Sequence, residues 1–303
     1  MNLLMLWLQN NNHKVYKMTD CNISTVLFKT KELLTTHGIE EANLQAELLI
    51  MKALNVSRTF LHTHPEKRLA DTEQSILRTY LGRRISGEPW PYISGNREFF
   101  GLNIKITHGV FIPRPETESL VELVLKEVAL RGLHENLHVA DVCTGSGAIA
   151  VALAYWMPGA TVYATDTSTV SLATATENIK EYGLLTQVFP LNGHLLCPLP
   201  RTVDIIVSNP PYIKTSDLKH LQREVLFEPT LALDGGEHGT DVILQLMRQI
   251  SNMSRMPRLF VSEILPETSG DLVRIARQIL PSAEFKIHTD YAGSDRFLVG
   301  KFS

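Results

Sequence analysis

From residue 137 onward, short apolar segments alternate with longer amphipathic ones, and this alternation restricts the fold more than any other feature. The short segments are rich in β-branched residues, which fill the buried strands of parallel sheets. Such a chain is expected to fold as an α/β sheet with helices on both faces. Strands are predicted at 137–142, 161–166, 187–191, 203–208, 259–264, 285–290 and 296–301. Helices are predicted at 148–156, 169–182, 239–251 and 268–280, and a hairpin turn at 291–295 makes the last strand pair antiparallel.

The part of the chain before this sheet predicts a different organisation. Residues 24–84 show helical spacing only, with one helix ending near His37 and Gly38, and Asp71 and Gln74 resembling a capping box at the start of another. Residues 87–115 are rich in proline and glycine and include a predicted hairpin at 98–106. We therefore expect a flexible extension at 1–17, a helical domain at 18–86, a hairpin-containing linker at 87–115 and an α/β domain at 116–303.

The composition excludes several classes of protein. The net charge of −3 and the pI near 6.4 do not provide the basic field that nucleic-acid binding uses. The apolar run in the first eight residues is too short to span a bilayer. The three cysteines are widely spaced, which fits a reducing cytoplasm and neither a disulfide framework nor a zinc site. We expect a cytoplasmic protein that binds no metal and does not associate with membranes.

The strand predicted at 203–208 is followed at once by Asn209, Pro210, Pro211 and Tyr212. Proline lacks a main-chain N–H and disfavours helix for the residue before it, so the strand ends here. In open α/β sheets, ligands bind at the carboxyl ends of the strands. The Asn209 side-chain oxygen and the Pro210 carbonyl can each accept one N–H of an amide or aromatic amine, and Tyr212 offers a ring face for stacking. The segment predicts a site that holds a planar –NH2 group.

The loop between the first predicted strand and helix of the sheet predicts a nucleotide-containing ligand. Its glycines, with Ala150, match Gly-x-Gly-x-x-Ala, and Asp166 about 20 residues on suits a ribose hydroxyl pair, so a nicotinamide dinucleotide fits the loop alone. Two features favour S-adenosyl-L-methionine instead: the approach to the loop carries a carboxylate that would attract a cationic aminoacyl group, and Asn209 begins an amine-holding site. The approach and the loop contain Asp141, Cys143, Thr144, Gly145, Ser146 and Gly147.

Together these segments resemble the bacterial release factor glutamine methyltransferases (the PrmC/HemK family), over nearly the whole chain from about Met18. The resemblance rests on Ile-Pro-Arg-Pro-Glu-Thr-Glu at 112–118, the segments 141–147, 209–212 and 227–229, Asp166, and Asp-Tyr-Ala-Gly-Ser-Asp-Arg at 290–296. The chain departs from the family pattern at Cys143, where glycine or leucine is usual, at His194, where an aspartate is common, and after Glu263, where a glycine is expected.

The resemblance implies a Rossmann-like, seven-stranded methyltransferase domain at 116–303 and a substrate-docking role for the helical domain. It implies methylation of the glutamine amide in the Gly-Gly-Gln motif of class 1 peptide chain release factors, with S-adenosylmethionine as cofactor and S-adenosylhomocysteine as product. The implied cofactor-binding residues are Asp141, Cys143, Thr144, Gly145, Ser146, Gly147, Asp166, Leu195 and Asn209. The implied substrate-binding residues are Arg114, Asn209, Pro210, Pro211 and Tyr212, of which Asn209, Pro210 and Tyr212 are the expected catalytic residues.

Two other functions remain open from the residues alone. An amino methyltransferase acting on adenine in DNA or RNA would use the same amine-holding corner, although the chain offers only local basic clusters such as Arg83 and Arg84. A cofactor-binding protein without catalysis would dock its helical domain on a partner, and the intact Asn209–Tyr212 segment argues against it. We expect a monomer that binds release factors and makes no direct contact with nucleic acid.

Overall fold

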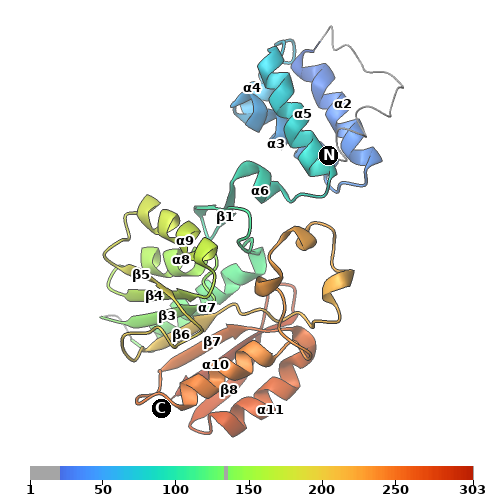
Figure 1. Ribbon diagram of the computed structural model, residues 1–303. Coiled ribbons are helices and arrows are strands. Elements are labelled where there is room, and N and C mark those ends of the chain that lie inside the picture. Colours follow the sequence, from blue (N-terminus) through green and yellow to red (C-terminus); the bar gives the residue numbers. More distant parts are fainter. Residues whose placement is uncertain (1–20, 133–135, 303) are drawn as a thin grey trace. The chain divides into compact units, whose positions relative to one another are not determined.

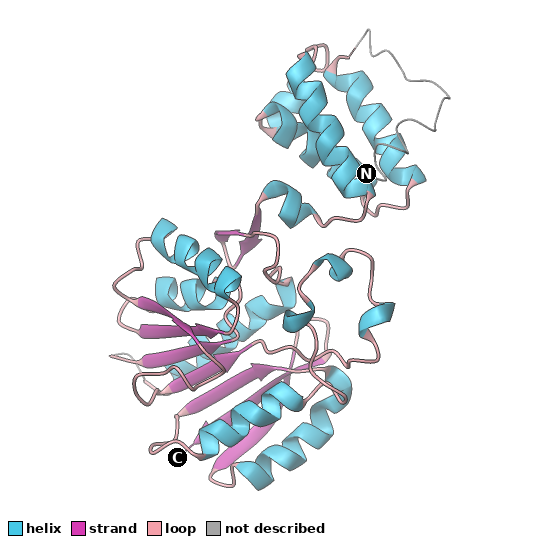
Figure 2. Cartoon of the chain, in the orientation of Figure 1, coloured by secondary structure: helices cyan, strands magenta, loops and turns pink. Residues whose placement is uncertain are grey.

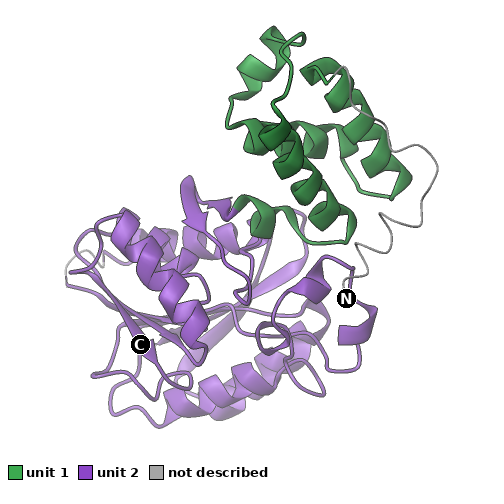
Figure 3. Ribbon diagram, turned by 45° about the horizontal axis from the view of Figure 1, so that its top comes forward, with its two compact units in different colours: residues 1–94 green, residues 95–303 purple. Residues whose placement is uncertain are grey.

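The computed structural model of the chain (Figure 1) describes residues 21–132 and 136–302, so the extension predicted at 1–17 lies outside the described residues. Figure 2 shows helices and strands separately, and Figure 3 colours two compact units, Met1–Ser94 and Gly95–Ser303. The boundary between the units falls inside the segment 87–115 that the sequence predicts as a linker. No helix among the described residues is long and apolar enough to cross a membrane.

The described part of the first unit is helical, as its spacing predicts. Asn22 caps the helix that begins at Ile23, its side-chain oxygen accepting a hydrogen bond from the main-chain N–H of Thr25 at 2.9 Å. The helices bury one core that includes Leu34, Leu49 and Leu61. The elements are α2 (Ile23–Thr36), α3 (Ala42–Leu54), α4 (Arg58–Thr63), α5 (Asp71–Ile85) and α6 (Trp90–Ser94).

One helix start in this unit differs from the prediction. The N-cap of α5 is Ala70, and Asp71 is the first helical residue, so the predicted capping box of Asp71 and Gln74 is wrong. The Glu73 carboxylate accepts a hydrogen bond from the main-chain N–H of Ala70 at 2.8 Å, which supplies one half of a capping box one residue earlier. The short helices α4 and α6 were not predicted, because one or two turns show too little periodicity.

The second unit begins with a hairpin that confirms the prediction at 98–106. Strands β1 (Asn96–Phe99) and β2 (Leu102–Lys105) pair antiparallel. Helix α7 (Pro115–Leu130) follows, with Pro115 at its first position, where the missing N–H costs no intrahelical hydrogen bond. Its N-cap is Arg114, which places this arginine at the junction between an extended segment and a helix.

A seven-stranded sheet forms the centre of this unit, in the order β5-β4-β3-β6-β7-β9-β8. The five strands from β5 to β7 run parallel, and β9 pairs antiparallel with β7 and with β8. The pairing of β8 with β9 confirms the prediction from the hairpin turn. The strand order reverses between β3 and β6, and a crevice at such a switch point is where open α/β sheets bind ligands. The strands are β3 (His138–Val142), β4 (Thr161–Asp166), β5 (Val188–Asn192), β6 (Ile205–Ser208), β7 (Leu259–Glu263), β8 (Ala283–Thr289) and β9 (Asp295–Phe302).

Helices cover both faces of the sheet. Figure 1 shows α8 and α9 on one face and α10 and α11 on the other. The apolar side chains of α10 and α11 form one buried cluster with sheet residues such as Val142, Ile206 and Phe260. This arrangement confirms the predicted Rossmann-like fold. The helices are α8 (Ala148–Trp156), α9 (Thr169–Glu181), α10 (Asp241–Ser251) and α11 (Ser269–Ile279).

The connection from β6 to α10 is the part of the sheet domain that the sequence did not predict. It contains three 3₁₀ helices that carry no helical periodicity of their own, η1 (Leu218–His220), η2 (Val225–Phe227) and η3 (Thr230–Ala232), and a fourth, η4 (Pro266–Thr268), precedes α11. Gly235 lies directly against the segment after β6, since a Cβ there would be 2.6 Å from the Cα of Tyr212. A glycine at this position therefore lets the connection fold back over the end of β6.

Candidate active site

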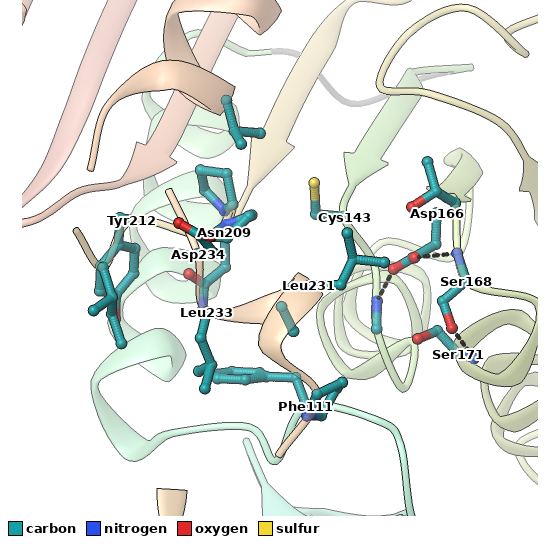
Figure 4. Close-up of a pocket in the computed structure, with 18 of the residues that line it drawn as sticks. Phe111, Cys143, Asp166, Ser168, Ser171, Asn209, Tyr212, Leu231, Leu233 and Asp234 are labelled. Atoms are coloured by element: carbon teal, nitrogen blue, oxygen red, sulfur yellow. Dashed lines mark hydrogen bonds between the residues drawn. The ribbon is translucent and has the colours of Figure 1, made fainter. Parts of the chain in front are cut away.

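A cavity of about 350 Å³ lies at the carboxyl ends of the parallel strands. Figure 4 shows Asn209 and Tyr212 on one side of it, Asp166 on another, and Cys143 between them. Asn209 and Tyr212 follow β6, Asp166 ends β4 and Cys143 follows β3, so the cavity lies at the switch point between β3 and β6. The other residues that line it are Gly109, Phe111, Arg114, Gly145, Thr167, Ser168, Ser171, His194, Leu195, Pro210, Pro211, Ile213, Leu221, Val225, Pro229, Leu231, Ala232, Leu233, Asp234 and Val242.

The glycine loop after β3 turns the main chain sharply into α8. Gly147 is the N-cap of α8 at φ 79°, a left-handed conformation that side chains other than glycine adopt at a cost. A Cβ at Gly147 would also lie 2.9 Å from the Cβ of Ala175 on α9, so the two helices approach closely here. Gly145 and Cys143 line the cavity, whereas Thr144, Ser146 and Gly147 are buried behind it and shape the loop.

Asp141 is buried beneath this loop, and it is not part of the cavity wall. One carboxylate oxygen, Oδ2, accepts hydrogen bonds from the Thr144 hydroxyl at 2.5 Å and from the main-chain N–H of Ala150 at 3.1 Å. The other, Oδ1, is buried without a hydrogen-bond partner among the described residues. Burial raises the pKa of Asp141 to about 7. A buried unpaired carboxylate oxygen fits a cationic group, and direct contact with a cofactor stays a prediction.

Asp166 lines the cavity at the end of β4. Its Oδ2 accepts a hydrogen bond from the main-chain N–H of Gly145 at 2.9 Å, and its Oδ1 accepts one from the N–H of Ser168 at 2.8 Å. Burial raises the pKa of this carboxyl. Each oxygen keeps a second lone pair, so the carboxylate can still accept from two hydroxyl groups. This arrangement fits the predicted ribose site.

Two further predicted cofactor residues line the cavity in left-handed backbone conformations. Cys143 has φ 62° and Leu195 has φ 52°, both uncommon for residues with side chains. Burial raises the pKa of the Cys143 thiol. His194 also lines the cavity, and its Nδ1 lies 3.4 Å from Nε2 of Gln249. The sequence indicated His194 only as a departure from the family pattern, and the structure places it on the wall beside Leu195.

The segment after β6 is brought into the cavity as a unit, since Asn209, Pro210, Pro211 and Tyr212 all line it. The side-chain amide nitrogen of Asn209 donates a hydrogen bond to Oγ1 of Thr117 at 3.1 Å. Neither Oδ1 of Asn209 nor the main-chain carbonyl of Pro210 accepts a hydrogen bond from the residues that the structure describes. Two acceptors at this wall are therefore available to a ligand.

A buried carboxylate that the sequence analysis did not place in the site lies behind these acceptors. Glu263, the last residue of β7, is 1% exposed and accepts hydrogen bonds from the Thr117 hydroxyl at 2.8 Å and the Tyr212 hydroxyl at 2.9 Å. Burial raises the pKa of Glu263, and the two hydroxyl donors oppose that effect. Burial also raises the pKa of Tyr212. The adjacency of β6 and β7 was the signal that could have identified Glu263.

Arg114 lines the cavity, but its charge is already paired. Its guanidinium forms an ion pair with the buried Glu228, whose other oxygen accepts a hydrogen bond from the main-chain N–H of Ile112 at 3.0 Å. The guanidinium carbon also lies 5.0 Å from the centre of the Phe111 ring. Burial raises the pKa of Glu228, and the charge of Arg114 opposes this. Arg114 therefore connects the segment before α7 to the β6–α10 connection, and substrate binding by Arg114 stays a prediction.

Comparisons with known proteins agree with this architecture. The family model described as the PrmC N-terminal domain matches residues 25–95, and the model described as the methyltransferase small domain matches 102–237. The catalytic domain of hMettl16 in complex with MAT2A 3'UTR hairpin 1 is similar in fold, at 15% identity and a TM-score of 0.55, covering 79% of this chain and 84% of that one.

Similarity in sequence extends over most of the chain. The release factor glutamine methyltransferase of Moorella thermoacetica is 38% identical over 264 residues, which are 87% of this chain and 92% of the relative. That of Koribacter versatilis is 40% identical over 261 residues, or 85% of this chain and 90% of the relative. That of Coxiella burnetii is 43% identical over 201 residues, or 66% and 70%. The chain belongs to the family of release factor glutamine methyltransferases.

Proposed function

We propose that this protein methylates the side-chain amide nitrogen of the glutamine in the Gly-Gly-Gln motif of class 1 peptide chain release factors. Relatives that share 32–43% of their sequence with this chain bear the name release factor glutamine methyltransferase. The observation that carries the proposal is the pair of acceptors at the cavity wall, the Asn209 Oδ1 and the Pro210 carbonyl. Two acceptors side by side match the two N–H groups of a primary amide.

The residues present fit S-adenosylmethionine as the cofactor. The Asp166 carboxylate has lone pairs left for two ribose hydroxyls, and the unpaired Oδ1 of Asp141 suits a cationic amino group. Leu195, which lines the cavity, would flank the adenine ring. Gly145 would bring bare main chain close to the methionine portion. When bound, S-adenosylmethionine supplies an electrophilic methyl group, and S-adenosylhomocysteine is the expected product.

The chain's own contribution to catalysis would be to orient and activate the amide. An amide nitrogen is a weak nucleophile, because its lone pair is delocalised into the carbonyl. Asn209 and Pro210, by accepting both N–H groups, increase the electron density at nitrogen and favour the tetrahedral geometry that it approaches in the transition state. They also fix the direction of the lone pair, and alignment of this kind lowers the barrier substantially. The methylated amide then loses one proton to water.

Methyl transfer to three acceptors in parallel tests the proposal. The acceptors are an intact class 1 release factor, the same factor with its Gly-Gly-Gln glutamine replaced by alanine, and adenine-containing DNA and RNA. We expect label from S-adenosylmethionine on the first alone. Label on the alanine-containing factor would mean that another residue is the target. Label on nucleic acid alone would be consistent with an amine-holding site at Asn209–Tyr212, but it would show that the substrate is adenine and not the glutamine of a release factor.

The helical unit would hold the release factor while the glutamine enters the cavity. Its family-model match over 25–95 supports this assignment. A chain shortened to the second unit should keep cofactor binding, because every residue that lines the cavity lies after residue 95. Its affinity for the release factor should fall, and unchanged affinity would contradict the docking role.

A further inference from the structure

Three side chains from separate parts of the chain form a continuous line of hydrogen bonds behind the cavity. The Asn209 amide nitrogen donates to the Thr117 hydroxyl oxygen, and the Thr117 hydroxyl donates to Oε2 of Glu263. Glu263 also accepts from the Tyr212 hydroxyl through Oε1. Thr117 is 2% exposed and Glu263 is 1% exposed, so water does not compete for these bonds.

The direction of each bond follows from the number of hydrogens available. The hydroxyl donors Thr117 and Tyr212 and the charge of Arg296 favour the ionised form of Glu263, although burial opposes it. In that form the carboxylate has no hydrogen, so both hydroxyls donate to it. The Thr117 hydroxyl has a single hydrogen, which is used in this bond, so its oxygen can only accept from Asn209. An amide offers its nitrogen as donor and its oxygen as acceptor, and therefore the Asn209 nitrogen must point to Thr117. The amide oxygen is then the atom left for the cavity.

We propose that Glu263 is a positioning residue that, through Thr117, fixes the orientation of the Asn209 amide and thereby makes the site selective for an amide over a carboxylate. This inference rests on the proposed function, since it concerns how the same site recognises glutamine. If the Asn209 amide were reversed, its nitrogen would face the substrate. A donor would then meet the donor N–H groups of glutamine, whereas the carboxylate of glutamate would be accepted.

Glutamine in place of Glu263 perturbs this line of hydrogen bonds with little change in shape, because it has one acceptor fewer. The two hydroxyls of Thr117 and Tyr212 then face one oxygen and one NH2 group. When the NH2 group faces Thr117, the Thr117 hydroxyl must accept from it and donate to Asn209, which reverses the Asn209 amide. When it faces Tyr212, the Tyr212 hydroxyl has to redirect its hydrogen. Only the first arrangement reverses the Asn209 amide, so Glu263→Gln permits the reversed amide without requiring it.

Substitutions at Thr117 test the same line of hydrogen bonds, because Thr117 lies between Asn209 and Glu263. Thr117→Val has nearly the same shape but no hydroxyl, so the Asn209 amide loses the group that distinguishes its two orientations. Thr117→Ser restores the hydroxyl and serves as the conservative rescue variant. Glu263→Gln, Thr117→Val, Thr117→Ser and the unchanged protein are compared for methyl transfer to a Gly-Gly-Gln release factor. Each is also compared for inhibition by a factor with glutamate at that glutamine and for S-adenosylhomocysteine affinity.

We expect kcat to fall about 100-fold in Thr117→Val, the size seen when one oriented group at a transition state is lost, and by a smaller factor in Glu263→Gln. Inhibition by the glutamate-containing factor should strengthen about tenfold in Thr117→Val, which leaves the charge of the site unchanged and corresponds to one lost unfavourable contact. The affinity for S-adenosylhomocysteine should stay unchanged, and Thr117→Ser should restore kcat to near that of the unchanged protein.

Two outcomes would overturn the proposal. One is an unchanged preference for amide over carboxylate in Thr117→Val, because a purely structural role predicts that result. The other is equal kcat in Thr117→Val and Thr117→Ser. The proposed function has a separate test, because Asn209→Ala removes the acceptor itself. Full activity of Asn209→Ala would contradict both proposals, whereas loss in Asn209→Ala alone would contradict only the role of Glu263.

Discussion

Asparagine in place of Asp141 should stabilise the cofactor-free protein, and the gain should grow as the pH rises. Burial holds the pKa of Asp141 at about 7, above its ordinary value of 3.8. Because the pKa is higher in the folded state, the unfolded chain loses this proton first. The stability that the protonated form provides is therefore complete below about pH 4 and is lost as the pH rises through 7. The difference between the two pKa values corresponds to about 4 kcal/mol of folding free energy.

The structure explains why asparagine should remove this penalty. Its side-chain oxygen can accept the hydrogen bonds that Oδ2 of Asp141 receives from Thr144 and Ala150. Its NH2 group would occupy the place of Oδ1, which is buried without a partner among the described residues, and it carries no charge to desolvate. We expect the stability difference between the variant and the unchanged protein to increase by about 3 kcal/mol from pH 5 to pH 8.

Urea unfolding followed by circular dichroism at four pH values between 5 and 8 measures this difference. The control is Asp271→Asn, which removes a surface carboxylate whose Oδ1 lies 3.0 Å from Nη2 of Arg274. That change should alter stability by less than about 0.5 kcal/mol at every pH. A stability difference for Asp141→Asn that is the same at pH 5 and pH 8 would refute the reasoning. If Asp141 also attracts the cofactor's amino group, cofactor affinity should fall about 10-fold to 100-fold in the variant, the opposite direction from stability.

Three other substitutions or reactions give independent checks. Asn209→Ala should lower kcat for methyl transfer by about 100-fold to 1000-fold with little change in cofactor affinity, measured by steady-state kinetics and calorimetry. Gly147→Ala should lower the free energy of unfolding by about 1–3 kcal/mol in thermal denaturation, because its Cβ would meet that of Ala175 at 2.9 Å. Alkylation by iodoacetamide, followed by mass spectrometry, should modify the exposed Cys197 first, because burial raises the pKa of the Cys143 thiol and so suppresses the reactive thiolate.

Those parts of the fold that depend on local pattern could be predicted from the sequence. Alternation of strand and helix from residue 137 predicts the parallel sheet, and all seven strands lie within two residues of their predicted positions. Asn209 to Tyr212 could be assigned to a site because a strand that ends in two prolines places polar groups at the ligand-binding edge. Asp166, at the end of β4, was identified by its position about 20 residues after the glycine loop.

Other features depend on contacts between segments that are far apart in the sequence, and local sequence patterns do not predict such contacts. The pairing of Arg114 with Glu228 joins residues 114 positions apart, so Arg114 appeared from its neighbours to be a free cationic group. Leu231 and Leu233 line the cavity from a connection with no periodicity, which gave no signal for an element. Asp141 was predicted at the cofactor, and its depth below the loop could be known only once Thr144 and Ala150 had been folded around it.

Glu263 lies between these two cases, because strand order alone would have located it. Ser208 of β6 pairs in register with Ser262 of β7, and both strands run in the same direction. The next residues, Asn209 and Glu263, therefore lie side by side at the carboxyl edge of the sheet. A carboxylate at that place cannot act as a donor, so any hydroxyl between it and Asn209 has to transmit its orientation. Any variant that keeps the carboxylate at 263 and a hydroxyl at Thr117 should therefore keep the Asn209 oxygen facing the substrate amide.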